Sequence, residues 1–147
     1  MKAPFLLGRL IFGGFFLYSG INHFRNREMM TQYAASKNIP VPDAAVTVSG
    51  AALIAGGASL LLGVKPKLGA AAIAGFLLGV SPVMHDFWRR EEPDQRRAET
   101  INFLKNMALL GAAMALMGVE EPWPASLPVA QPTPIDRVRR AVRKIAA

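Results

Sequence analysis

The chain has 147 residues, of which 52% are hydrophobic and 18% are charged, and its formal net charge is +7. This length suffices for one compact domain and not for two of ordinary size. The composition is too apolar for a disordered chain. Cysteine is absent, which excludes disulfides, thiolate metal sites, iron–sulfur clusters and dithiol redox exchange within this chain.

Four long apolar segments predict four membrane-spanning helices: residues 4–24, 44–64, 68–85 and 101–119. The second is uncharged over 21 residues, and the third over 18 when its histidine is neutral. About 20 apolar residues in a helix cross the hydrocarbon core of a bilayer. Only Arg9 and Lys105 interrupt the first and fourth segments, and their long side chains can reach toward the interfaces. We therefore expect an all-α integral membrane four-helix bundle.

Small residues are frequent in all four segments: Gly13, Gly14 and Gly20 in the first, Gly50, Gly56 and Gly57 in the second, Gly69, Gly75 and Gly79 in the third, and Gly111 in the fourth. Lipid supplies no hydrophobic drive for helices to associate, so small residues favour association by letting backbones approach closely. The pattern predicts tight packing within the bundle or against a partner protein.

The segments between the spans carry most of the charge. Residues 26–38 predict a short helix in the membrane interface, with an apolar face around Met30 and with Arg27 and Lys37 facing water. Residues 86–100 predict a solvated charged loop, whose local ion pairs contribute little stability.

The chain changes character after the fourth span, where the four-span domain 1–119 ends. Five prolines predict an extended linker over residues 120–134. Residues 135–147 predict a basic amphipathic tail for an anionic membrane surface, with Arg137, Arg140, Arg143 and Lys144 as its basic residues. Disorder or docking on a partner is the alternative for this tail. No aromatic platform or base-reading motif accompanies the charge, so nucleic acid is not an expected partner.

Four spans place both termini on the same side of the membrane. Eight Lys and Arg residues fall on that side and seven on the other, with Lys105 at the edge. The excess of positive charge in cytoplasmic segments orients membrane proteins. We expect both termini to be cytoplasmic.

Polar side chains at membrane depth are costly and therefore mark candidate sites. Arg9 lies near one end of the first span, at the depth of Ser59 in the second. The other candidates for ligand binding gather where three spans end on the opposite side: His23, Ser81, His85, Trp88, Asn102 and Asn106.

Three interpretations of this polar cluster are open. The side chains can cap helix ends and join neighbouring helices. They can form a pocket for a lipophilic molecule with a polar head such as a quinone, with His23, His85 and Asn106 as hydrogen-bond donors. They can hold a metal through His23, His85 and Asp86, which is the least favoured because adjacent side chains on a helix point in different directions. Haem held between the two histidines is a variant of this metal interpretation. No hydrolase or phosphate-loop motif is present.

Four stretches resemble the DoxX family of small bacterial inner-membrane proteins: GRLIFGGFFLYSGINHF (8–24), YAASKNIPVP (33–42), SGAALIAGGASLLLG (49–63) and HDFWRREEPDQRRAETINFLKNMALLG (85–111). The resemblance covers about residues 5–119. It implies a four-helix, multi-pass fold in the bacterial inner membrane. It also implies an association with redox functions, since members include a thiosulfate:quinone oxidoreductase subunit and complexes that protect against oxidative stress.

The resemblance assigns motif positions to Arg9, His23, His85, Phe87, Trp88, Asn102, Lys105 and Asn106. Many members carry a glutamate where this chain has Leu53, so Arg9 lacks the acidic partner that it would have there. The resemblance thus implies a subunit of a membrane redox system, enzymatic or not, that binds a quinone or similar ligand near His23 and His85. The alternative is a scaffold or assembly factor for a partner oxidoreductase. Assembly of this chain into a homo-oligomer is a further alternative.

Overall fold

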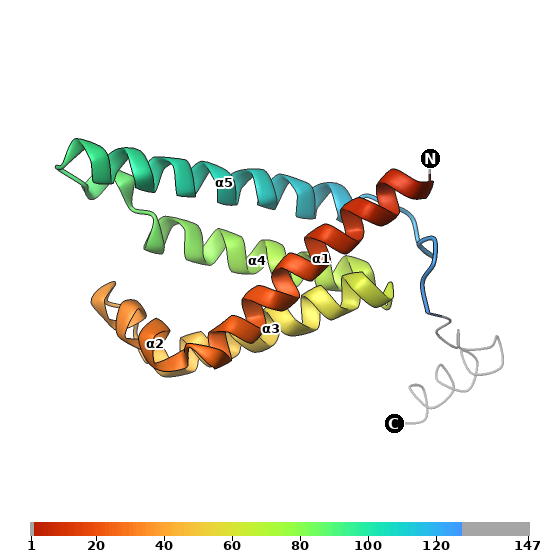
Figure 1. Ribbon diagram of the computed structural model, residues 1–147, viewed down its shortest axis with the longest axis horizontal. Helices are drawn as coiled ribbons and strands as arrows, with labels where there is room; N and C mark the ends of the chain where they lie inside the picture. The colour runs from red at the N-terminus through yellow and green to blue at the C-terminus, as the bar shows by residue number, and fades with distance from the viewer. Residues whose placement is uncertain (1, 128–147) are drawn as a thin grey trace, which may run out of the picture.

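The computed structural model describes residues 2–127, and these form helices and no strand (Figure 1). The elements are α1 (Lys2–Arg25), α2 (Arg27–Ser36), α3 (Pro42–Leu62), α4 (Pro66–Met84), the short 3-10 helix η1 (Phe87–Arg89) and α5 (Pro93–Met117). Helices α1, α3, α4 and α5 are long and apolar enough to cross a membrane. The predicted all-α, four-span fold with a short helix after the first span is therefore confirmed.

Prolines and residues in the left-handed conformation place the helix boundaries. Helices α3, α4 and α5 each begin with a proline, which fits the first turn because no intrahelical hydrogen bond is needed there. Gly63 ends α3 with φ 68°, and its amide donates to the Leu60 carbonyl at 3.3 Å. Asn38, with φ 57°, follows α2 in the same conformation.

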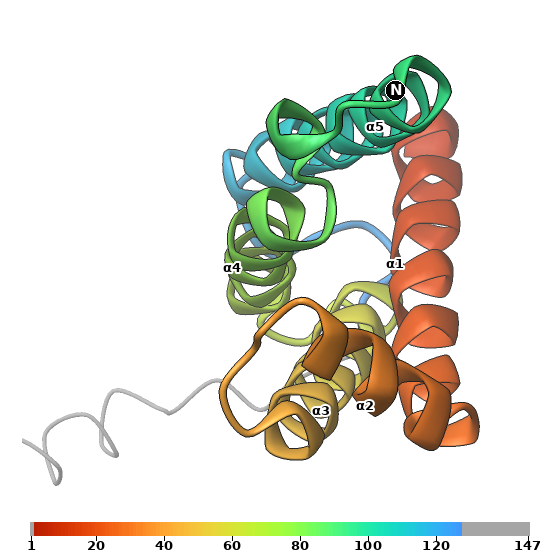
Figure 2. The same ribbon diagram turned by 90° about the vertical axis from the view of Figure 1, so that its left-hand side faces the viewer.

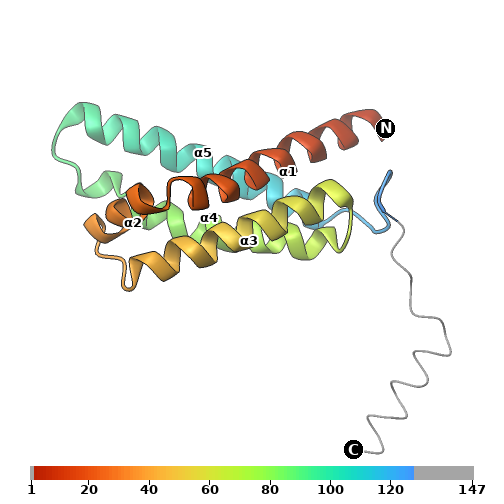
Figure 3. The ribbon, with the colours of Figure 1, turned by 60° about the horizontal axis from the view of Figure 1, so that its bottom comes forward.

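The helices pack in chain order, α1 along α3, α3 along α4 and α4 along α5. Seen from one end, α1 and α4 lie on opposite sides, with α5 and α3 between them (Figure 2). Helix α1 crosses the others obliquely, so its N-terminal end approaches α5 while its C-terminal end lies with α2 and α3 (Figures 1 and 3). At the α2 end of the bundle, α1 and α5 are therefore apart.

Glycines allow the close contact between α1 and α3. A Cβ added at Gly57 would lie 2.5 Å from the Leu17 amide nitrogen, and one at Gly20 would lie 2.7 Å from the Gly50 carbonyl oxygen. Glycines also allow close contact between α3 and α4, since a Cβ added at Gly69 would lie 2.8 Å from the Gly56 carbonyl oxygen, whereas a Cβ at Gly14 would meet nothing within 4 Å. The predicted small-residue packing thus applies to the contacts of α3 with α1 and with α4.

The segment after α5 folds back onto the bundle (Figure 1). Trp123 is buried, and its ring packs edge-on against Phe5 of α1 with centroids 5.2 Å apart. The Leu127 amide donates to the carbonyl of Leu62 at the end of α3, at 2.9 Å. Residues 120–127, which the sequence assigns to a linker, therefore pack against the domain. The rest of that segment and the predicted basic tail lie outside the described residues.

Candidate ligand-binding site

A partly enclosed cavity of about 640 Å³ lies at the α2 end of the bundle. Residues from all five α-helices line it, together with the segment between α2 and α3. Most of its walls are apolar, and the polar side chains that line it are Ser19, His23, Tyr33, Ser49, His85 and Asn106. Both histidines of the chain therefore border the same cavity.

His23 is held at the cavity wall by three helices. Its Nδ1 lies 2.7 Å from the carbonyl oxygen of Ser19, one turn earlier on α1. Its stem lies against α3, where a Cβ at Gly50 would approach the His23 Cβ to 2.8 Å. Its ring meets the Phe76 ring of α4 edge-on, with centroids 6.0 Å apart. These contacts fix the imidazole in one place.

His85 joins the end of α4 to α5. Its amide donates to the Ser81 carbonyl at 3.0 Å, which continues the helical pattern by one residue. Its Nδ1 lies 2.8 Å from Oε2 of Glu99, and the two side chains are 23% and 22% exposed. This contact sets the orientation of the His85 ring beside the cavity.

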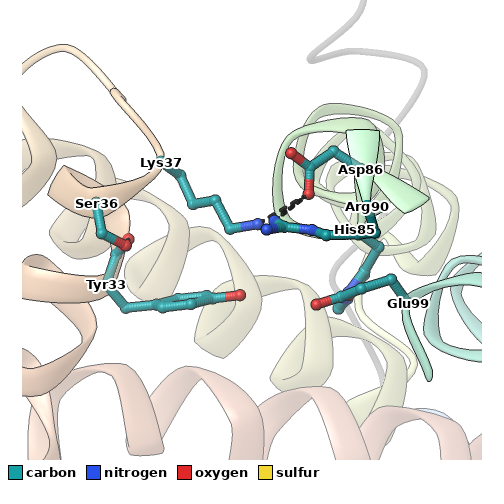
Figure 4. A network of polar contacts seen from close by, with 7 residues as sticks. All are labelled: Tyr33, Ser36, Lys37, His85, Asp86, Arg90 and Glu99. Atoms are coloured by element: carbon teal, nitrogen blue, oxygen red, sulfur yellow. Dashed lines mark hydrogen bonds and ion pairs between the residues drawn. The ribbon is translucent and has the colours of Figure 1, made fainter. Parts of the chain in front are cut away.

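Three charged residues, Lys37, Asp86 and Arg90, form a charged rim between α2 and the segment that follows α4 (Figure 4). Lys37 Nζ donates to Asp86 Oδ1 at 2.9 Å, and Arg90 donates to the same oxygen. The Lys37 ammonium lies 5.8 Å from the Tyr33 ring centroid. The Tyr33 hydroxyl is directed toward Glu99 (Figure 4).

One expectation about these charges is wrong: Lys37 does not face water, because its side chain is only 11% exposed and is turned toward Asp86. The 86–100 segment is solvated as expected, since residues 91–98 are exposed. It is not a loop, however, because η1 and the first turns of α5 occupy much of it. Arg27 does face water as expected; its hydrogen bonds to Asp43 at the surface raise the pKa of its guanidinium above the usual value.

Arg9 lies away from the cavity, about 21 Å from His23 along α1 by helical rise. It is 1% exposed. Its Nη1 donates to the Pro124 carbonyl at 2.8 Å, and its Nη2 donates to the carbonyls of Ala125 and Leu61 at 3.1 and 3.4 Å. The charge is thus surrounded by backbone carbonyl dipoles from two segments.

The surroundings of Arg9 explain how it is accommodated without a carboxylate. Leu53, where the resemblance implied an acidic partner for Arg9, is completely buried in the apolar core. The Trp123 ring centroid lies 5.9 Å from the Arg9 guanidinium carbon, in a cation–π contact. Ser59, expected at the depth of Arg9, donates to the Val64 carbonyl at 2.7 Å. The folded-back segment, and not α3, supplies most of the partners of Arg9.

Comparison with protein families places most of this bundle in one of them. The DoxX family model matches residues 5–86, which is more than half of the chain. The chain belongs to the DoxX family. With four helices able to span a membrane, it is a multi-pass membrane protein. The match covers α1 to α4 and ends just after His85, so α5 lies beyond it. Comparisons with curated proteins and with solved structures gave no match.

The cavity of this DoxX protein brings together only part of the predicted ligand-binding set. His23, His85 and Asn106 line it. The other four predicted residues do not line it. Ser81 is buried and donates to the Leu77 carbonyl, and Asn102 is half-buried on α5. Trp88 is 49% exposed beside Phe87 and Phe103, and Arg9 lies away from the cavity.

Glu99, Tyr33 and Lys37 are site residues of this DoxX protein that the sequence reasoning missed. A signal for Glu99 exists, because Glu99, Asn102 and Asn106 follow the three- and four-residue spacing of one helix face. Tyr33 and Lys37 stand four residues apart at the end of α2, but nothing in the sequence points to Asp86 as the partner of Lys37, because Asp86 lies 49 residues further along the chain.

The described residues of this DoxX protein contain no group of three His, Asp or Glu side chains placed to hold a metal ion. His85 pairs with Glu99, whereas the neighbouring Asp86 pairs with Lys37 and Arg90. The set His23, His85 and Asp86 is therefore not brought together.

Proposed function

We propose that this DoxX protein binds a quinone or a similar lipophilic molecule with a polar head, as a subunit of a membrane redox system. The observation that carries the proposal is the cavity of about 640 Å³ with apolar walls and both histidines at its border. Binding sites for small molecules and cofactors have volumes of about 300–1,000 Å³ and combine apolar walls with a few polar groups.

The apolar walls suit a ring and a hydrocarbon tail. Phe15, Phe16 and Phe76 line the cavity and can pack against a ring face to edge or in an offset stack. Phe15 is also 52% exposed on the outer surface of α1, which faces lipid in a membrane. A ligand tail can therefore leave the cavity on this side and continue into the bilayer.

The polar groups suit the head of such a ligand. The Asn106 side chain can donate and accept hydrogen bonds, and each imidazole has a second nitrogen beyond the contact already described. The charged rim lies between α2 and the end of α4. A head group at the histidines is thus close to the membrane surface, where it can exchange protons with water.

A partner is expected to supply the electrons. The chain has no cysteine, so it cannot carry a dithiol or a thiolate-bound cluster of its own. The proposal therefore includes a membrane-associated oxidoreductase partner, in the bacterial inner membrane and with both termini of this chain in the cytoplasm.

The test is a titration of the purified full chain in lipid nanodiscs with decylubiquinone, followed by isothermal calorimetry. We expect saturable binding that weakens at least tenfold in Gly79→Leu. Gly79 lines the cavity, and a Cβ there would enter open space, so the new side chain occupies the cavity without a backbone clash. Gly111→Leu is the matched control, since Gly111 also has open space but lies outside the cavity. Absence of saturable binding to the wild-type protein would remove the proposal.

A scaffold or assembly role is the second candidate, and the structure of α5 favours it. Among the described elements, α5 packs mainly on α4 and η1 and leaves large apolar side chains exposed, including Leu104 and Met114. A partner helix can cover this surface in place of lipid. An oxidoreductase that co-purifies equally with the wild-type protein and with Gly79→Leu, in the absence of quinone binding, would favour this role.

A further inference from the structure

The hydrogen bond of His23 determines which of its ring nitrogens carries the proton. A backbone carbonyl oxygen accepts hydrogen bonds and cannot donate them. Because Nδ1 lies 2.7 Å from the Ser19 carbonyl oxygen, Nδ1 must carry a hydrogen and donate it. In neutral His23 the other nitrogen, Nε2, then has a lone pair and is an acceptor.

The Nε2 atom of His23 has no hydrogen-bond partner among residues 2–127. It is also not among the buried unpaired atoms of this part of the chain, so it has accessible surface. His23 lines the cavity, and the ring edge bearing Nδ1 is occupied by Ser19. The edge that carries Nε2 is therefore the one available to a ligand.

His85 differs from His23 because its partner is a carboxylate. A carboxyl group, unlike a carbonyl, accepts a hydrogen bond from Nδ1 when it is ionised and donates one to Nδ1 when it is protonated. The Nε2 atom of neutral His85 can thus accept in the first case and donate in the second. The amide of Asn106 also has both capacities. Of the polar groups His23, His85 and Asn106, neutral His23 is therefore the one that discriminates between a ligand that donates a hydrogen bond and a ligand that accepts one.

We propose that the cavity selects a ring bearing a hydroxyl group, a phenol or hydroquinone, which donates its O–H to His23 Nε2. This inference rests on the proposed function and specifies which form of the ligand the site prefers. A quinone carbonyl brings a second acceptor to Nε2 and leaves both unpaired, and unpaired buried polar groups reduce affinity strongly.

The experiment compares three probes of the same shape: tetramethylhydroquinone kept under argon, tetramethyl-1,4-benzoquinone and tetramethylbenzene. Affinities for the full chain in nanodiscs are measured by calorimetry, for the wild type and for His23→Phe, which keeps a ring at this position. We expect the hydroquinone to bind about tenfold more tightly than the other two. In His23→Phe, the hydroquinone should lose this advantage while the affinity for tetramethylbenzene changes less than twofold. Titration of nanodiscs without protein gives the partition of each probe into lipid, and the affinities are corrected for it before the probes are compared.

The possible outcomes separate this inference from the proposed function. Equal affinity of the wild type for the three probes overturns the hydroxyl preference and leaves the binding cavity standing. Absence of saturable binding by any probe overturns both.

A measurement on the wild-type protein makes the test independent of the folding of His23→Phe. In nitrogen-15 NMR of labelled histidine at alkaline pH, where imidazoles are neutral, Nε2 of His23 should give the signal of an unprotonated ring nitrogen. That signal should move on addition of the hydroquinone and not of the quinone. A protonated Nε2 in the unliganded protein would refute the assignment.

Discussion

The most unusual residue of this protein is Arg9, a fully buried cation in a membrane-spanning helix that forms no ion pair within residues 2–127. Its guanidinium donates to carbonyls of Pro124, Ala125 and Leu61, which belong to two different segments. A planar group with five N–H donors can serve several acceptors at once. The ammonium group of a lysine is smaller and more strongly hydrated and cannot match this geometry.

We expect Arg9→Lys to lower the stability of the protein by about 1–3 kcal/mol, because at least one buried carbonyl loses its partner. The midpoint of thermal unfolding in detergent, followed by tryptophan fluorescence, measures the change. Arg25→Lys is the control, since Arg25 is exposed at the end of α1 and should unfold like the wild type. Equal midpoints for both variants would show that the hydrogen bonds of Arg9 do not stabilise the fold.

At the scale of helices, the contact between α1 and α3 depends on glycines at which the two backbones approach. The added Cβ at Gly57 would meet backbone atoms of Leu17, which cannot move aside as a flexible side chain can. Gly14 follows Gly13 of that contact face directly but points elsewhere, with open space around it. Alanine substitutions at the two positions therefore distinguish the effect of helix packing on stability from the effect of helix propensity.

Gly57→Ala should lower stability by about 1–3 kcal/mol through overpacking. Gly14→Ala should leave stability unchanged or raise it by up to about 1 kcal/mol, because alanine favours the helix over glycine. Circular dichroism at increasing temperature gives both values. A Gly57→Ala protein as stable as the Gly14→Ala protein would contradict the close packing of α1 and α3.

Helix α2 is attached to the end of α4 by the pair of Lys37 and Asp86. Both side chains are largely covered, at 11% and 14% exposure, so the pair is shielded from solvent more than an ordinary surface ion pair. Because α2 forms part of the cavity wall through Met30 and Tyr33, loosening this pair should also open the cavity.

We expect Lys37→Ala to increase hydrogen exchange of the α2 amides, since it leaves α2 without its contact to Asp86. The matched control is Arg27→Ala, which removes an ion pair with 48% and 57% exposed side chains from the same helix and should change exchange little. Mass spectrometry of peptides covering α2 measures both. If both variants exchange alike, the charged rim does not hold α2 in place.

At the scale of the whole molecule, the segment after α5 completes the core on the side opposite the cavity. Trp123 packs on Phe5 and covers Arg9, and the Leu127 amide bonds to the end of α3. The first and last parts of the described chain are thereby joined. The described domain consequently extends beyond α5 to residue 127.

Trp123→Ala should destabilise the protein by about 3–5 kcal/mol, because it removes a buried ring and exposes the charge of Arg9. The half-exposed Trp88 is the comparison, and Trp88→Ala should cost clearly less. Thermal unfolding followed by circular dichroism is suitable for both variants, since each lacks one tryptophan. Similar losses would mean that residues 120–127 are only loosely attached.

The sequence predicted the four spans, the short helix after the first and the meeting of His23, His85 and Asn106 at one end. These features follow from local properties. The number of consecutive apolar residues decides whether a helix can cross a bilayer, and the alternation of spans decides which helix ends share a side. Glycine and proline mark the helix ends for the same local reason.

Only the tertiary structure decided the partners of the polar side chains. Whether Lys37 meets water or Asp86, and whether Arg9 meets a carboxylate or the carbonyls near Trp123, depends on how each helix is rotated and crossed against the next. Apolar length and periodicity are compatible with many such arrangements. The contacts of packed backbones and of the folded-back segment select one of them.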